Sequence, residues 1–240
     1  MKLLLLCLLF TSLCARAEDV STAPYTIVTF GDSTTAPRGK LKVYSDWLAE
    51  RLGSQNVRVI NRGQPGDTTS AALKRFPAVL AEHPRLVIIQ FGINDSAIDV
   101  WKTPPRTKPR VSLNDYDKNI RGFIHGVRKS GGSPILVTPN QLRWTPPMLE
   151  RYGHLPAYDP HDEKGFSKSL SAYAECLRKI AREENVTLVD VYALYDEWEK
   201  TSQKSSGALL IDGMHPNSEG QRLVADALEP AILKIRKCQP

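Results

Sequence analysis

The sequence lacks internal repeats, linkers and, beyond its amino end, long apolar runs. After the first 17 residues no stretch approaches the roughly 18 uninterrupted apolar residues of a transmembrane helix, so we expect no stable membrane insertion of the mature chain. No repeat, low-complexity tract or linker divides the 240 residues, and this length suits one sizeable α/β domain. These absences favour a single soluble domain.

The amino end is the one strongly apolar segment. It reads MKLLLLCLLFTSLCARA, with a positive start, an apolar core from Leu3 to Leu13 and an Ala-x-Ala box at 15–17. This pattern predicts a signal peptide over residues 1–17, cleaved after about Ala17, and a secreted or periplasmic domain over 18–240. A lipoprotein anchor at Cys14 is the alternative, weakened because Leu13 occupies a place that normally requires a small residue.

Cysteine is also scarce. Of the four cysteines, only Cys176 and Cys238 remain after loss of the signal peptide. In an oxidising compartment this pair predicts one disulfide that ties the carboxyl tail to the domain, with two unpaired thiols as the alternative.

The positive charge is mild. The formal net charge of +6 falls to +4 when Lys2 and Arg16 leave with the signal peptide. Basic residues concentrate at 101–110, WKTPPRTKPR, but three prolines break this run and it lacks interleaved aromatics, so we expect no nucleic-acid partner. A solvated loop is the favoured interpretation, and attraction of an anionic substrate is the alternative.

Apolar, β-rich runs alternate with segments of helical period along the chain. The runs lie at 26–30, 57–60, 86–91, 134–139 and 187–192, and the helical segments at 44–52, 69–80, 113–129, 166–184 and 218–235. Because parallel strands need crossover connections, this alternation predicts a doubly wound, three-layer α/β/α sandwich around a central, mostly five-stranded parallel sheet. Residues 97–111 and 141–165 are expected to be long loops after strand ends, where open parallel sheets bind their ligands.

Polar residues with catalytic potential follow three of these runs. Ser33 comes directly after the first run and is a candidate nucleophile, although Gly31, Asp32 and Ser33 also suit an ordinary turn. After the second run, Gly66 precedes a predicted helix and offers a backbone N–H at its amino end. After the third, Asn94 offers a side-chain amide donor, with a structural Asx-turn as the alternative.

A fourth motif, LLIDGMHPNSEG at 209–220, supplies a base. Asp212 and His215 lie three residues apart, ahead of a helix that Pro216 and Asn217 are placed to start. A serine nucleophile needs a base to take its proton, and the base needs a carboxylate to orient it. Ser33, His215 and Asp212 fill these roles; a capping aspartate and a surface histidine are the alternative.

Together these residues resemble the SGNH, or GDSL, hydrolase superfamily, whose blocks occur here in order as GDST, NRGQPGDT, GIND and DGMHP. The resemblance runs from Tyr25 to near the carboxyl end. It implies a flavodoxin-like fold, Ser33 as nucleophile, His215 as general base and acid, and Asp212 as its partner. It also implies an oxyanion hole from the N–H groups of Ser33 and Gly66 and the side chain of Asn94. The chemistry needs no metal and no cofactor.

Thr34 stands where the family's name places leucine, a variant that resembles carbohydrate esterases such as rhamnogalacturonan acetylesterases and acetylxylan esterases. Arg143 and Trp144, in the second long loop, are candidate substrate-binding residues for a sugar, with a miniature core of the loop's own aromatics as the alternative. The histidines and aspartates of that loop match no compact metal-ligand pattern. Asn185 heads a possible glycosylation acceptor, NVT.

Three functional hypotheses follow. The first is a secreted carbohydrate O-deacetylase acting on a small-molecule or polysaccharide ester. The second is a general short-chain or lipid-directed esterase or thioesterase. Such an enzyme requires an apolar groove for the acyl chain, and the polar, proline-rich loops do not indicate one. The third is a catalytically silent sugar-binding module, disfavoured because every catalytic position is filled.

Overall fold

The computed structural model describes residues 23–239, so the predicted signal peptide lies outside the described residues. Its centre is a five-stranded parallel sheet in the order β2-β1-β3-β4-β5, as expected for a flavodoxin-like fold. The strands are β1 (Tyr25–Gly31), β2 (Val57–Gly63), β3 (Leu86–Gln90), β4 (Ser133–Val137) and β5 (Thr187–Val189). The predicted fold class is therefore confirmed.

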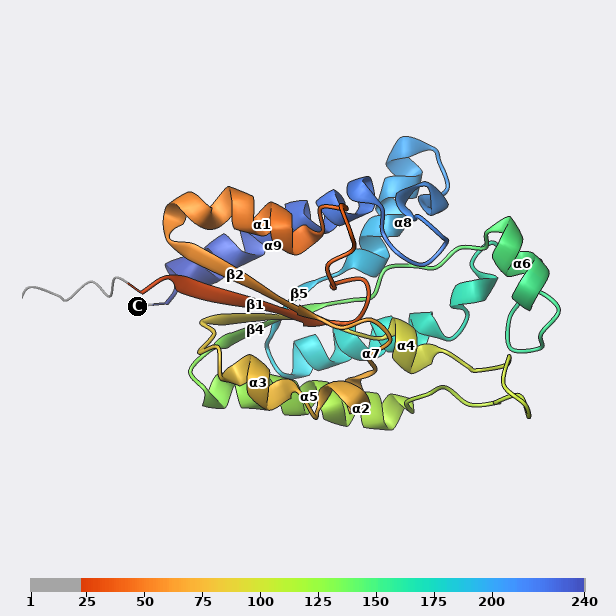
Figure 1. The fold of residues 1–240 in the computed structure, drawn as a ribbon, viewed down its shortest axis with the longest axis horizontal. Helices are drawn as coiled ribbons and strands as arrows, with labels where there is room; N and C mark the ends of the chain where they lie inside the picture. The colour runs from red at the N-terminus through yellow and green to blue at the C-terminus, as the bar shows by residue number, and fades with distance from the viewer. Residues whose placement is uncertain (1–22, 240) are drawn as a thin grey trace, which may run out of the picture.

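Helices cover both faces of the sheet (Figure 1). On one face lie α1 (Tyr44–Leu52), α8 (Val191–Ser202) and α9 (Ser218–Lys237), and on the other α2 (Thr69–Ala72), α3 (Phe76–Leu80), α5 (Leu113–Lys129) and α7 (Leu170–Glu183). Each face of the sheet has its own apolar core, because successive side chains of a strand point to opposite faces. Ile27 and Ile88 pack against α1 and α9 on one face. Val28 and Ile89 pack against α5 and α7 on the other. The two short helices α4 (Ile93–Ser96) and α6 (Pro146–Tyr152) lie beyond the carboxyl ends of the strands.

Three predicted segments differ from the structure. The segment 141–165, expected to be a loop, contains the helix α6. The helix expected over 69–80 is two short helices, because Pro77 has no N–H to continue the first and suits the first turn of the second. The strand expected over 187–192 stops at Val189, and α8, which the sequence analysis missed, begins at Val191 with the Asp190 carboxylate accepting the Ala193 N–H as its cap.

The predicted disulfide between Cys176 and Cys238 is not formed: both cysteines are free. Cys176 lies on α7 and packs against the core of one face of the sheet, whereas Cys238 ends α9, which covers the opposite face (Figure 1). The two cysteines therefore belong to helices on opposite faces of the sheet, and a disulfide needs Cα atoms within about 7 Å.

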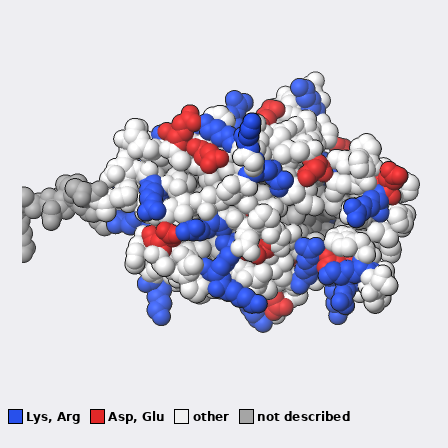
Figure 2. Space-filling model, viewed as in Figure 1, with Lys and Arg blue, Asp and Glu red and all other residues white. Residues whose placement is uncertain are grey.

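The outer surface is mixed in charge. Figure 2 shows Lys and Arg spread over the face in view with acidic side chains among them. Within residues 23–239, no helix has the length and apolar character that a membrane crossing requires.

Candidate active site

The structure brings Ser33, His215 and Asp212 together. Ser33 follows β1, and the other two come from the loop before α9. His215 Nε2 lies 3.0 Å from Ser33 Oγ, and His215 Nδ1 lies 2.7 Å from Asp212 Oδ2. In a neutral imidazole whose Nδ1–H donates to the carboxylate, Nε2 is free to accept the serine proton. Residues 182 positions apart thus form one hydrogen-bonded chain.

The turn that carries Ser33 is held by buried hydrogen bonds. The carboxylate of Asp32 accepts from the backbone N–H and the hydroxyl of Thr34, both at 2.9 Å. Gln221 of α9 donates to the Thr34 carbonyl at 3.0 Å. Thr34 therefore helps to fix the turn that carries Ser33, and its side chain is buried and does not face a ligand. Burial raises the pKa of Asp32 to about 6, opposed by the hydrogen bonds from Thr34.

The loop that carries the imidazole is equally constrained. The Asp212 Oδ1 atom accepts from the N–H groups of Met214, at 3.1 Å, and of His215, at 2.8 Å. Burial would raise the pKa of Asp212, but the hydrogen bonds from His215 and Met214 hold it below its usual value, so this carboxylate stays ionised beside the imidazole. Gly213 turns the loop at φ +80°, and a Cβ there would lie 2.3 Å from the Arg143 carbonyl oxygen. Only glycine meets both demands.

The two other predicted donors, Gly66 and Asn94, lie beyond the ends of β2 and β3. Gly66 adopts φ +81° in the loop after β2. Asn94, on α4, donates through Nδ2 to the Asp67 carbonyl at 3.0 Å, and its Oδ1 accepts from Arg110 at 3.3 Å. These contacts fix the orientation of the Asn94 amide and leave its second N–H for another acceptor. The short helix α2 begins beyond Gly66, with Thr68 as its N-cap.

Arg75 is a structural contributor that the sequence analysis missed. Its guanidinium donates to the Asp67 carboxylate at 2.5 Å and to the Gly31 carbonyl at 2.8 Å, and it lies over the Phe30 ring. It thus joins the end of β1, which leads to Ser33, to the loop that carries Gly66. No local pattern singles out this arginine, because Gly31 lies 44 residues away in sequence.

A small, mainly apolar cavity of about 70 Å³ adjoins the rim. Asn94 and Met214, the neighbour of His215, form part of its wall, together with Trp101, Leu142 and Phe166. An engineered protein cavity of about 150 Å³ binds benzene, so this smaller space suits an acyl group of few carbons.

Arg143 is not placed to bind substrate, contrary to the sequence-based expectation. Its side chain is 2% exposed, and it donates to Gln141 and Glu199, each at 2.6 Å. Trp144 packs within a cluster of the loop's own apolar side chains, and its indole N–H donates to the Asp159 carbonyl at 2.9 Å. The alternative interpretation, a miniature core beneath the loop, describes this segment better.

The other polar residues of that loop serve the backbone. The carboxylate of Asp159 accepts from the His161 N–H, and that of Asp162 from the Lys164 N–H. Over residues 23–239 no three His, Cys, Asp or Glu side chains gather in a way that would hold a metal ion.

Comparison with known proteins places this site in a family. The sequence matches the GDSL-like lipase/acylhydrolase family over residues 29–223, and the chain therefore belongs to that family. It is a carboxylic ester hydrolase. The motif-based resemblance is confirmed.

Individual relatives carry different names. The chain is 39% identical to Esterase TesA of Pseudomonas aeruginosa (88% of this chain, 89% of the relative) and 30% identical to the uncharacterized lipoprotein YqeF of Bacillus subtilis (85% and 87%). It is 26% identical to an acetylxylan esterase of Geobacillus stearothermophilus (71% and 70%). Among solved structures, a lipase/acylhydrolase from Enterococcus faecalis superposes with a TM-score of 0.64 at 25% identity, over 86% of this chain and 94% of that one.

Proposed function

We propose that the mature domain is a secreted serine esterase that removes O-acetyl groups from a carbohydrate through an acyl-enzyme on Ser33. The observation that carries this proposal is the hydrogen-bonded chain from Ser33 through His215 to Asp212. The proposed signal peptide supports action outside the cytoplasm, and the lipoprotein among the relatives keeps anchoring at Cys14 as the alternative.

In the proposed cycle, Ser33 Oγ attacks the ester carbonyl while His215 Nε2 takes its proton. The imidazolium, stabilised by Asp212, then returns that proton to the departing sugar hydroxyl. A water molecule, deprotonated by His215, attacks the acyl-enzyme and releases acetate, and the proton passes back to Ser33. The N–H groups of Ser33 and Gly66 and the Asn94 amide would donate to the oxyanion, and one such donor typically lowers the barrier by about 2.7–4 kcal/mol.

The size of the acyl group is argued from the cavity beside Asn94. Its volume of about 70 Å³ accommodates an acetyl group, which supports a short acyl chain. The acetylxylan esterase among the relatives supports the sugar ester.

A second candidate is a general short-chain or lipid-directed esterase or thioesterase on the same residues. The 39% identity to Esterase TesA favours it. The two candidates differ in the acyl chain and the alcohol, not in the first chemical step, so they are separable by substrate.

The test is acetate release by the purified domain from acetylated xylan and pectic oligosaccharides, beside nitrophenyl esters of increasing chain length. We expect acetate from at least one glycan and a steep fall from acetyl to octanoyl among the nitrophenyl esters. Ser33→Ala should lower the rate by on the order of 10⁴-fold or more, whereas Ser171→Ala, an exposed serine on α7, should not.

A preference for long chains with no acetate from any glycan would establish the second candidate. Binding of glycans without hydrolysis of any ester would instead indicate the silent sugar-binding module.

A further inference from the structure

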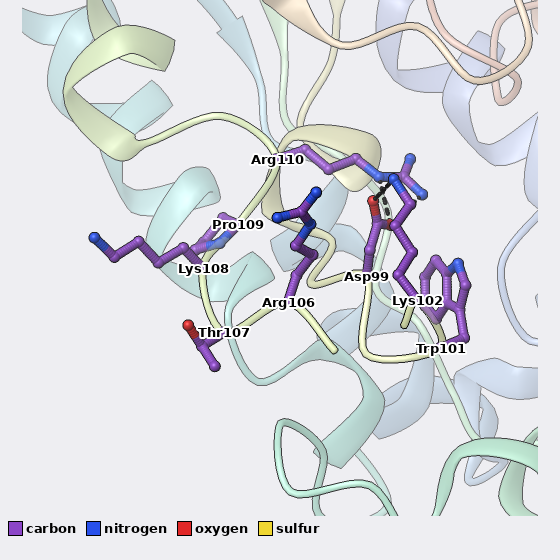
Figure 3. Close-up of a pocket in the computed structure, with 8 residues that line it drawn as sticks. All are labelled: Asp99, Trp101, Lys102, Arg106, Thr107, Lys108, Pro109 and Arg110. Carbon is purple, nitrogen blue, oxygen red and sulfur yellow. Dashed lines mark hydrogen bonds and ion pairs between the residues drawn. The ribbon is translucent and has the colours of Figure 1, made fainter. Parts of the chain in front are cut away.

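A second, strongly basic pocket lies beside the proposed active site and has no part in the proposed mechanism. It has a volume of about 620 Å³ and is formed by the loop after α4 (Figure 3). Its lining residues, which define the basic pocket, are Asp99, Trp101, Lys102, Arg106, Thr107, Lys108, Pro109 and Arg110.

The one carboxylate of the basic pocket is already neutralised. Asp99 pairs with Lys102 and with Arg110, each at 2.8 Å. Burial would raise the pKa of Asp99, but these two cations keep it below its usual value, so it stays ionised. The Asp99 ion pairs also hold Lys102 and Arg110 in place at the pocket wall (Figure 3).

Two further cations of the pocket have no acidic partner. Within residues 23–239, the side chains of Arg106 and Lys108 form no ion pair and no hydrogen bond, and both residues are exposed. Arg106 extends toward Arg110 and Asp99, so its guanidinium adds positive charge to the pocket (Figure 3). Like charges gathered around a concave space attract an anion more strongly than the same charges dispersed over a surface.

The pocket also has an aromatic wall. The Trp101 side chain is 44% exposed although it is a large hydrophobic residue, and its ring lies 5.9 Å from the Arg110 guanidinium. An exposed indole face beside guanidinium groups can contact the C–H face of a sugar ring while the cations bind a carboxylate on that ring.

The basic pocket shares a wall with the proposed acyl site. Trp101 and Arg110 line both this pocket and the small cavity that contains Asn94 and Met214. Arg110 also donates to the Asn94 side chain at 3.3 Å. A negative group bound in the basic pocket would therefore lie next to Arg110, which contacts the proposed oxyanion donor Asn94.

We propose that the basic pocket binds a carboxylate on the sugar of the ester substrate, so that acetylated uronides are preferred over acetylated neutral sugars. Arg106 is the principal ligand, because a guanidinium binds a planar carboxylate with two parallel hydrogen bonds. Arg110 adds positive charge, and Trp101 packs against the ring. This inference rests on the proposed deacetylase function.

The test uses a matched pair of substrates: an acetylated oligogalacturonide with free carboxylates and the same oligosaccharide after methyl esterification. We expect the kcat/KM for acetate release to be at least tenfold higher for the free acid, and this preference to shrink at high salt. Arg106→Gln should lower the preference about fivefold to thirtyfold, chiefly through KM. Lys129→Gln, an exposed lysine at the end of α5, is the matched control and should leave the preference intact.

The outcomes separate this inference from the deacetylase proposal. Equal kcat/KM for the two oligosaccharides, or an Arg106→Gln variant with unaltered preference, would overturn the carboxylate site while leaving the deacetylase standing. Preference for an acetylated sulfated sugar over both would also overturn it, in favour of sulfate. If no glycan releases acetate, calorimetric binding of oligogalacturonide to Ser33→Ala decides: binding that Arg106→Gln abolishes supports the pocket, and no binding refutes it.

Discussion

Replacement of the buried Arg143 by methionine should destabilise the domain and disturb its active site. Arg143 is 2% exposed, and its guanidinium donates to Glu199, Gln141 and the Leu142 carbonyl. Methionine fills much of the same volume but leaves Glu199 without its principal cation. Loss of one partner of a fully buried ion pair costs about 3–5 kcal/mol.

We expect the loss of stability at this site to be smaller than for a fully buried ion pair. The Glu199 side chain is 23% exposed, and it keeps a hydrogen bond from the Ser206 N–H at 2.8 Å. We therefore expect a loss of about 2–3 kcal/mol in the free energy of unfolding, since partial hydration relieves the unpaired charge. For a domain of this length, that corresponds to a fall in Tm of roughly 4–12 °C.

Activity should fall as well, because the side-chain contacts of Arg143 hold the backbone segment whose N–H donates to the Gly213 carbonyl at 2.9 Å, on the loop that carries Asp212 and His215. The assay combines urea unfolding with kcat measured where the variant is fully folded. We expect kcat to fall while the preference of the enzyme for acyl chain length stays the same.

The matched control is Arg182→Met. Arg182 has a side chain 67% exposed and pairs with Glu175 at 3.6 Å, so its loss should cost about 0–1 kcal/mol. A double variant, Arg143→Met with Glu199→Met, should recover part of the loss because no buried charge remains unpaired. If Arg143→Met costs no more than Arg182→Met, the buried pair does not hold this loop and the reasoning is refuted.

Three further predictions concern separate parts of the molecule. Asn94→Ala should reduce kcat by about 10²–10³-fold with little change in Tm, and an unchanged kcat would remove Asn94 from the oxyanion hole. Burial raises the pKa of Asp95 to about 6, so the contribution of this carboxyl to stability should fall as the pH rises from about 4 through 6. Urea unfolding of the wild type and of Asp95→Asn at both ends of that window should therefore show a different change in stability with pH, and an identical change would contradict the prediction. A thiol reagent should detect two free thiols in the mature domain, and reductant should not change its Tm. Cys238 is exposed and should react fast, whereas Cys176 should react slowly because burial raises its pKa to about 11. Detection of no free thiol would show that the disulfide forms.

The sheet was predictable because its signal is local. Each central strand is a short, continuous apolar run, and Leu86–Gln90 is buried along its whole length, as a parallel strand covered on both faces must be. The helix α8 was missed for the same reason: Val191 and Tyr192 extend the β-rich run after Val189, and only the Asp190 cap signals that the chain has turned into a helix.

The residues of the candidate site could be predicted from the sequence, but the residues that hold them in position could not. Ser33 and Asn94 follow strands, and parallel topology alone brings strand ends to one rim. The residues that hold them, such as Arg75 and Gln221, act over long sequence separations through single hydrogen bonds, which leave no periodic pattern. Arg143 was misassigned because a charged residue in a long loop is usually exposed, and its burial depends on Glu199, 56 residues away.

Family membership and substrate choice are carried by different parts of this molecule. Ser33, Asn94, Asp212 and His215 belong to short motifs after β1, on α4 and in the loop before α9. The basic pocket is lined by residues of the segment 99–110 alone. The small cavity is lined by part of that segment and by Tyr158 and Phe166, together with Asn94 and Met214. The loop after α4 and the segment that contains Tyr158 and Phe166 touch each other, since the Tyr158 hydroxyl donates to the Ile98 carbonyl at 3.2 Å. A change in either segment can therefore alter both pockets while the Ser33–His215–Asp212 chain stays in place, and we expect the choice of substrate to depend on these loops and not on the sheet.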